Sequence, residues 1–248
     1  METAEFIDTL RRDGTLLADA AERAGLDAAV PPCPGWRVRD LVRHQGIVHR
    51  WATLFVAEGR IRPEPMAAET PADDAELPVW FRDGHERLVS ALETAAPDLE
   101  CWHFLRADSP LGFWARRQAH ETAVHRVDAQ IAAGSAPSFV DPVFAADGID
   151  ELLTGFHARP KSRVRNVAPG TLRVRAVDLP AERGDWLAHV SADPLVVERA
   201  VERDADCTVS GTAADLYLAL WNRAPYEKLQ VTGDSSLVEL WRRTGAVT

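Results

Sequence analysis

Four segments in the first part of the chain carry apolar side chains at helical spacing, and prolines and glycines separate them. Apolar residues that recur every three or four positions line one face of a helix. Gly59, Pro97 and Gly134 follow three of these segments and mark their ends. Helices of about 20 residues bury such faces best against one another, so the pattern predicts an antiparallel four-helix bundle. The predicted helices are residues 2–25, 37–58, 75–95 and 112–133.

The rest of the chain changes to a mixture of alternating and helical patterns. Alternation of apolar and polar side chains is typical of strands, and strands followed by helices favour an α+β arrangement. The sequence therefore predicts two domains, a four-helix domain over residues 1–140 and a small α+β domain over residues 141–248. The alternating segments are 171–179, 186–190 and 207–211, and the helical segments are 149–156, 215–223 and 235–243.

The charge of the chain argues against nucleic acid as a partner. There are 38 acidic residues and 28 lysines and arginines, which gives a formal net charge of -10. Neutralisation of phosphates by basic side chains drives most nucleic-acid affinity. We therefore expect a small-molecule partner, without excluding a local basic patch.

No segment predicts attachment to a membrane or export. No apolar run approaches the roughly 20 residues that span a bilayer, and the first residues lack the apolar core of a signal peptide. Cys33, Cys101 and Cys207 are far apart and form no C-x-x-C pair, which fits free thiols in a reducing compartment. The expected location is the cytoplasm.

A group of metal-ligand residue types falls on two of the predicted helices. Glu121 and His125 are four residues apart, so their side chains project from the same helix face. His44 lies on the apolar side of the second predicted helix and supplies a third candidate ligand. Two histidines and one carboxylate leave coordination positions open for substrate or water. Zinc is the first choice for such a site, and Fe(II), Ni(II) or Mn(II) also suit it.

Each of these residues can also be explained by a structural role that involves no metal. A glutamate and a histidine at this spacing can simply support a helix, and a histidine on an apolar face can be a core residue. His49 and His120 should point away from the candidate ligands. Asp128 follows His125 by three residues, and either supports that imidazole or pairs with Arg126 or Arg117.

Three segments carry a resemblance to a known family. PCPGWRVRDLVRHQGIVHRWA and RRQAHETAVHRVDAQIAAG resemble the two signatures of the mycothiol-dependent maleylpyruvate isomerase family, within the DinB-like metalloprotein superfamily. VSGTAADLYLALWNRAPYEKLQVTGDSSLVELWRR resembles the family's small C-terminal domain. The resemblance implies a DinB-like helical bundle whose metal ligands are His44, Glu121 and His125. It also implies a catalytic arginine in the C-terminal domain, for which Arg223 is the candidate.

The same resemblance implies a cofactor and a reaction. The cofactor is the cytosolic thiol mycothiol, and the substrate is a small electrophilic or unsaturated acid. A metal-bound thiolate adds to a conjugated cis double bond, the bond rotates, and loss of the thiol leaves the trans isomer. Transfer of the thiol to an electrophile, as in an S-transferase, would use the same site.

Two further interpretations stay open on the sequence alone. One is a non-enzymatic protein, such as a metal-dependent anti-sigma factor or sensor, which keeps the metal ligands but turns over no thiol. The other is a structural bundle in which His44 and His125 are core residues. A monomer and a homodimer are both compatible with the sequence.

Overall fold

The computed structural model describes residues 1–200 and 202–247. The chain divides into two compact units, one from Met1 to Ser138 and one that begins at Phe139. The first unit is helical, and the second combines helices with a five-stranded sheet. The predicted fold class, a four-helix bundle followed by a small α+β domain, is confirmed.

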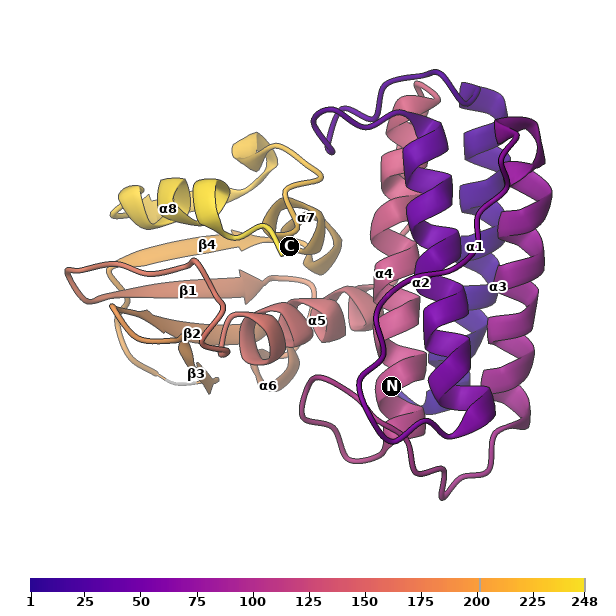
Figure 1. Cartoon of the computed structure of the whole chain (residues 1–248). Coiled ribbons are helices and arrows are strands. Elements are labelled where there is room, and N and C mark those ends of the chain that lie inside the picture. Colours follow the sequence, from indigo (N-terminus) through magenta and orange to yellow (C-terminus); the bar gives the residue numbers. More distant parts are fainter. Residues whose placement is uncertain (201, 248) are drawn as a thin grey trace. The chain divides into compact units, whose positions relative to one another are not determined.

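Four long helices lie side by side in the first unit (Figure 1). Gly59, at a φ of 60°, ends the second helix in the left-handed conformation, and Ser109 caps the fourth by accepting a hydrogen bond from the backbone of Gly112. The predicted helices thus begin and end close to where the sequence places them. They are α1 (Thr3–Ala24), α2 (Val38–Glu58), α3 (Leu77–Thr94) and α4 (Pro110–Ala132), with a short 3-10 helix η1 (Asp74–Glu76) before α3.

The second and third helices run in the same direction. Arg43 of α2 pairs with Asp74, at 2.6 Å, just before α3 begins, and further along both helices Arg50 pairs with Asp83 at 3.0 Å. The connection over residues 59–73 makes this parallel arrangement feasible, because an extended chain of that length reaches about 50 Å, more than the roughly 30 Å of α2.

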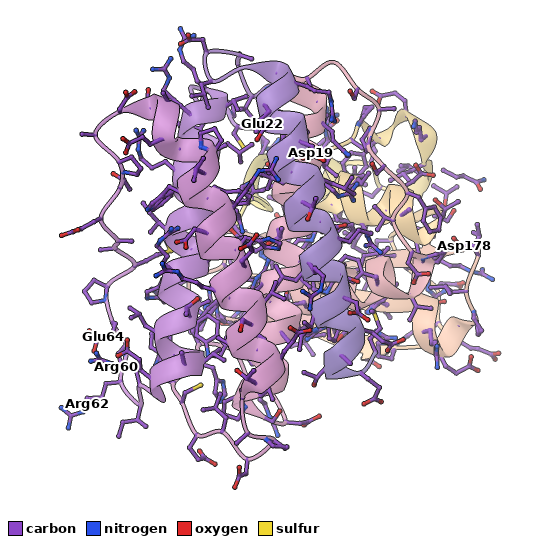
Figure 2. All side chains as sticks on the ribbon, turned by 90° about the vertical axis from the view of Figure 1, so that its right-hand side faces the viewer. Asp19, Glu22, Arg60, Arg62, Glu64 and Asp178 are labelled. Carbon is purple, nitrogen blue, oxygen red and sulfur yellow. The ribbon has the colours of Figure 1, made fainter. Side chains whose placement is uncertain are left out.

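The other pair, α1 and α4, runs the opposite way. Phe6 lies against His120, and Asp13 approaches Arg126 at 3.3 Å, so positions increase together along both helices. Asp19 and Glu22 lie toward the end of α1 (Figure 2). Both pair with Arg82, near the start of α3. The bundle therefore consists of two parallel pairs that are antiparallel to each other, so the predicted antiparallel packing holds between the pairs but not within them.

The fourth helix differs from the others in how much of it is buried. Its buried residues lie all around the helix and include polar and charged side chains such as Arg117, Thr122 and Asp128. A buried polar group destabilises the fold unless it has a partner. The partners of these side chains build the candidate site described below.

The second unit is built on a sheet with strand order β3-β2-β1-β4-β5. β1 and β4 are parallel, and the other neighbouring strands are antiparallel. The three predicted strands are β1, β2 and β4, whereas the short edge strands β3 and β5 carried no clear alternation. In chain order the elements are α5 (Pro142–Asp150), the π-helical η2 (Glu151–Phe156), β1 (Gly170–Ala176), α6 (Ala181–Gly184), β2 (Asp185–Val190), β3 (Val196–Arg199), β4 (Cys207–Gly211), α7 (Ala213–Leu220), the 3-10 helix η3 (Tyr226–Lys228), β5 (Gln230–Gly233) and α8 (Ser236–Thr244).

Across the described residues, no helix combines the length and the apolar character that a membrane span requires.

Candidate metal centre

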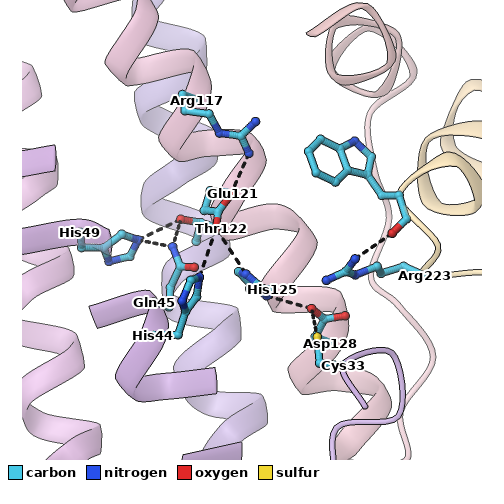
Figure 3. A network of polar contacts seen from close by, with 11 residues as sticks. Cys33, His44, Gln45, His49, Arg117, Glu121, Thr122, His125, Asp128 and Arg223 are labelled. Carbon is cyan, nitrogen blue, oxygen red and sulfur yellow. Dashed lines mark hydrogen bonds and ion pairs between the residues drawn. The ribbon is translucent and has the colours of Figure 1, made fainter. Parts of the chain in front are cut away.

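The three predicted ligands come together between α2 and α4. Nε2 of His44 lies 3.4 Å from Oε1 of Glu121, and Nε2 of His125 lies 3.3 Å from the same oxygen (Figure 3). The two imidazole rings stand edge to face, with their centroids 5.1 Å apart. The three candidate ligand atoms all lie within 4.8 Å of one another.

The spacing of these atoms fits one cation. Donor atoms about 2.0–2.1 Å from a tetrahedral zinc ion lie about 3.3 Å from each other, close to the separations of 3.4 and 3.3 Å between Oε1 of Glu121 and the two histidines. The side chains of His44 and Glu121 are 28% and 25% exposed, whereas that of His125 is 9% exposed. His44 and Glu121 are therefore partly accessible to solvent, whereas His125 is nearly buried.

The second nitrogen of His125 is bonded to a buried carboxylate. Nδ1 of His125 lies 2.8 Å from Oδ2 of Asp128, which also accepts a hydrogen bond from Sγ of Cys33 at 3.5 Å. Of the roles that the sequence left open for Asp128, support of His125 is the one that this contact favours. A hydrogen bond at Nδ1 leaves Nε2 as the nitrogen that can bind a metal.

Cys33, His125 and Asp128 also place three ligand-type atoms within 4.8 Å of one another. The distance between Nδ1 of His125 and Oδ2 of Asp128 decides how to interpret this group. At 2.8 Å it is a hydrogen-bond length, and it is shorter than the separation of about 3.3 Å between two ligands of one tetrahedral cation. The group is therefore a chain of hydrogen bonds that ends on His125.

The remaining oxygen of Glu121 is held by a buried arginine. Oε2 accepts a hydrogen bond from Nη2 of Arg117 at 3.1 Å, and only 3% of the Arg117 side chain is exposed. Sequence reasoning missed this role of Arg117. The signal was available in its spacing, because Arg117 precedes Glu121 by the same four residues that separate Glu121 from His125.

Opposing effects act on the pKa values of this cluster. Burial alone would raise the pKa of Glu121, but hydrogen bonds from His125 and His44 and the charge of Arg117 hold it well below the usual value. Burial alone would lower the pKa of His125, but its bonds to Asp128 and Glu121 raise it to about 9. Without a metal, the proton on His125 and the charge of Arg117 together balance the carboxylates of Glu121 and Asp128, and a divalent cation would replace the charge of that proton.

The loop before α2 places an indole ring against both histidines. The centroid of Trp36 is 5.1 Å from that of His44 and 6.2 Å from that of His125, and it stacks on His125 at an interplanar angle of 19°. Gly35, at a φ of 87°, turns the chain in a conformation that favours glycine. Trp36 therefore forms an aromatic wall beside the candidate ligands.

The other nearby histidines have different partners. His49 is fully buried, and its Nε2 lies 2.9 Å from Oγ1 of Thr122 and 2.8 Å from Nε2 of Gln45 (Figure 3). Burial lowers the pKa of His49 well below its ordinary value, and His85 adds to this effect. His120 is also fully buried and packs against Phe6. Both histidines thus lie outside the candidate ligand group.

Arg223 lies in the second unit, shortly after α7. Its Nη1 donates a hydrogen bond to the carbonyl oxygen of Trp221 at 2.8 Å. The predicted role of Arg223 toward a substrate remains a prediction.

Two models of known protein domains match the chain, one in each of its two units. A family model described as mycothiol maleylpyruvate isomerase N-terminal domain matches residues 7–130, and the MDMPI C-terminal domain matches residues 144–240. The chain belongs to the mycothiol maleylpyruvate isomerase family. The family resemblance predicted from the sequence is therefore confirmed.

Two solved structures share the fold of this family member. The crystal structure of a mutant of the mycothiol-dependent maleylpyruvate isomerase matches with a TM-score of 0.65 and 13% sequence identity, over 94% of this chain and 93% of that chain. The crystal structure of the mycothiol-dependent maleylpyruvate isomerase matches with a TM-score of 0.59 and 15% identity over the same shares. No significant match exists among curated proteins. At such low identity, the structural likeness shows the fold alone.

Proposed function

We propose that the protein is a metal- and mycothiol-dependent enzyme that isomerises a small unsaturated acid from cis to trans. The observation that carries the proposal is the position of Oε1 of Glu121, 3.4 Å from Nε2 of His44 and 3.3 Å from Nε2 of His125. Two imidazoles and one carboxylate are a donor set of catalytic metal sites with an open position. Family membership supports the thiol, since the family and both solved neighbours are named for mycothiol.

Zinc is the first choice of cation for these donors, with iron, nickel or manganese as alternatives. A divalent cation supplies Lewis acidity, which lowers the pKa of a coordinated thiol enough to deprotonate it near neutral pH. Asp128 keeps the Nδ1 proton of His125 on the far side of the ring, so that Nε2 faces Glu121. Trp36 packs against both imidazole rings and restricts their movement.

The proposed reaction consumes no reactant other than the substrate. The thiolate adds to one carbon of the conjugated cis double bond, the bond becomes single and rotates, and departure of the thiolate restores the double bond in the trans form. Arg223 is the candidate for binding the substrate carboxylate, because a guanidinium offers two parallel N–H donors to such a group.

Two alternatives use the same residues. An S-transferase would leave the thiol attached to an electrophilic product, and a metal-dependent sensor would bind metal without turnover. The isomerase is preferred because both solved neighbours with this two-unit fold are named as isomerases.

The first test is the metal content of the purified protein after incubation with zinc. We expect one equivalent in the wild type and a loss of most of it in His44→Ala, Glu121→Ala and His125→Ala. His189→Ala, which removes a partly exposed histidine of the second unit, is the matched control and should keep the metal. Absence of stoichiometric metal in the wild type would refute the proposal, and full occupancy in the ligand variants would refute the ligand assignment.

The second test is the mass of the product. The zinc-loaded protein is incubated with mycothiol and a panel of cis-dienoic acids and electrophiles. An unchanged substrate mass with a shifted ultraviolet spectrum supports isomerisation, and an added thiol mass supports transfer. Metal binding without any response to mycothiol or another small thiol would favour the sensor.

A further inference from the structure

The two carboxylate oxygens of Glu121 have different partners. Oε1 faces the two imidazoles, whereas Oε2 accepts a hydrogen bond from Arg117 at 3.1 Å. We propose that Arg117 is a positioning residue that makes Glu121 a one-oxygen ligand, so that the site prefers a four-coordinate cation such as zinc. This inference rests on the proposed metal site and specifies how that site selects its metal.

Arg117 is fixed well enough to act in this way. It precedes Glu121 by one helical turn on α4, and only 2% of the residue is exposed. A buried guanidinium needs hydrogen-bonding partners of opposite charge, because it has left water. Rotation of Glu121 to offer both oxygens to a cation would take Oε2 away from this donor. The buried arginine therefore opposes binding through both oxygens.

The number of donors follows from this constraint. With one oxygen from Glu121, the three side chains supply three donors, and a tetrahedral cation keeps one position for a thiol sulfur. With both oxygens they would supply four donors, which suits larger or higher-coordinate cations.

The distances between the ligand atoms support three donors rather than four. Ligands at right angles in an octahedral site with bonds of about 2.1 Å lie about 3.0 Å apart, whereas tetrahedral ligands lie about 3.3 Å apart. The observed separations of 3.3 and 3.4 Å from Glu121 to the two histidines match the tetrahedral value. Zinc also accepts sulfur more readily than manganese does, which agrees with a thiol as the fourth ligand.

The experiment compares the wild type with Arg117→Met, which removes the charge and keeps an unbranched apolar stem, and with Arg117→Lys, which keeps one donor. Arg116→Met is the matched control, because it removes the same charge from the neighbouring position on the helix. Each full-length protein is loaded with Co(II) for visible absorption spectroscopy, and its affinities for zinc and manganese are measured by competition titration.

We expect intense four-coordinate Co(II) bands in the wild type and in Arg116→Met. In Arg117→Met the bands should weaken toward those of a higher-coordinate ion, and the ratio of zinc to manganese affinity should fall by about 10- to 100-fold. Arg117→Lys should lie between the wild type and Arg117→Met. A purely structural role of Arg117 would lower the melting temperature but leave the Co(II) spectrum and the affinity ratio unchanged.

An unchanged Co(II) spectrum and affinity ratio in Arg117→Met would overturn this inference and leave the proposed function standing. Failure of the wild type to bind either zinc or cobalt would overturn the proposed function itself. If Arg117→Met does not fold, as judged by circular dichroism, Arg117→Lys decides: a weakened spectrum supports the inference, and an unchanged affinity ratio and spectrum contradict it.

Discussion

Nδ1 of His125 lies 2.8 Å from Oδ2 of Asp128, one turn further along the same helix. Asp128 is 0% exposed, so this carboxylate has no water to solvate it. Cys33, from the loop before α2, donates a hydrogen bond to the same oxygen. The carboxylate thus fixes the tautomer and the orientation of His125, and with them the direction of Nε2.

Replacement of Asp128 by Asn should weaken metal binding while the fold persists. The amide has nearly the same shape, but it carries no charge and can present its NH2 group to Nδ1, which would favour the wrong tautomer of His125. We expect zinc affinity to fall by about 10- to 100-fold, measured by competition with a chromophoric chelator. Asp108→Asn, at an exposed position of the same unit, is the control. Equal affinities in the two variants would show that Asp128 does not act through His125.

The sequence predicted the positions of the helices better than their directions or the edge strands of the sheet. Apolar spacing located α1 to α3, because each of these helices buries one apolar face, whereas α4 is buried on all sides. It could not predict that α2 and α3 are parallel, since direction depends on the path of the connection over residues 59–73. The edge strands β3 and β5 were missed because each has only four residues and neither alternates clearly in burial.

The same limit applies to the candidate site. The spacing of Glu121 and His125 predicted that both project from one helix face, and the structure brings them to 3.3 Å. The partner of Asp128 could not be read from spacing, because His125 and Arg126 both lie within three residues of it in the sequence. The contacts distinguish these roles: Arg126 pairs with Asp13 of α1, Arg117 bonds Glu121, and Asp128 bonds His125.

Loss of the Arg126 side chain should destabilise the bundle strongly. Nε of Arg126 lies 3.3 Å from Oδ2 of Asp13, and the two side chains are 1% and 2% exposed. Arg126→Ala leaves a buried carboxylate without this cation, so the free energy of unfolding should fall by about 3–5 kcal/mol. Arg12 also pairs with Asp13 but is 55% exposed, so Arg12→Ala should cost less than about 1 kcal/mol. Urea unfolding measures both, and equal losses would contradict the role of burial.

Two helical glycines of the bundle should respond differently to alanine. A Cβ atom at Gly14 would lie 2.2 Å from the ring of His85, whereas at Gly84 it would lie 2.1 Å from the terminal guanidinium nitrogen of Arg50. His85 is 6% exposed and its Nε2 bonds the carbonyl oxygen of Leu10, so the ring cannot move aside easily. Gly14→Ala should therefore lower the free energy of unfolding by about 1–3 kcal/mol.

Gly84→Ala is the matched comparison, because the atoms in its way are the end of a flexible side chain, and the helix propensity of alanine offsets part of the loss when Arg50 gives up its bonds to Trp80 and Asp83. We expect this change to stay within about 1 kcal/mol of the wild type. Thermal unfolding of both variants tests this pair of predictions. A larger loss of stability in Gly84→Ala than in Gly14→Ala would show that the ring of His85 moves aside more easily than the end of Arg50.

His157 should make the second unit sensitive to mild acid. Burial first, and then the charges of Arg159 and Arg165, lower the pKa of His157 to about 4 in the folded protein, while the unfolded chain should titrate near 6.5. Between these values only the unfolded chain binds the proton, so the contribution of His157 to the free energy of unfolding is fully present above about pH 6.5 and falls by about 3 kcal/mol as the pH approaches 4.

His157→Gln removes this proton-binding site, at the cost of altering the hydrogen bonds to Gly245 and Ser162. Its unfolding free energy should therefore change less between pH 7 and pH 5 than that of the wild type. A wild-type slope in His157→Gln would mean that other groups cause the acid sensitivity.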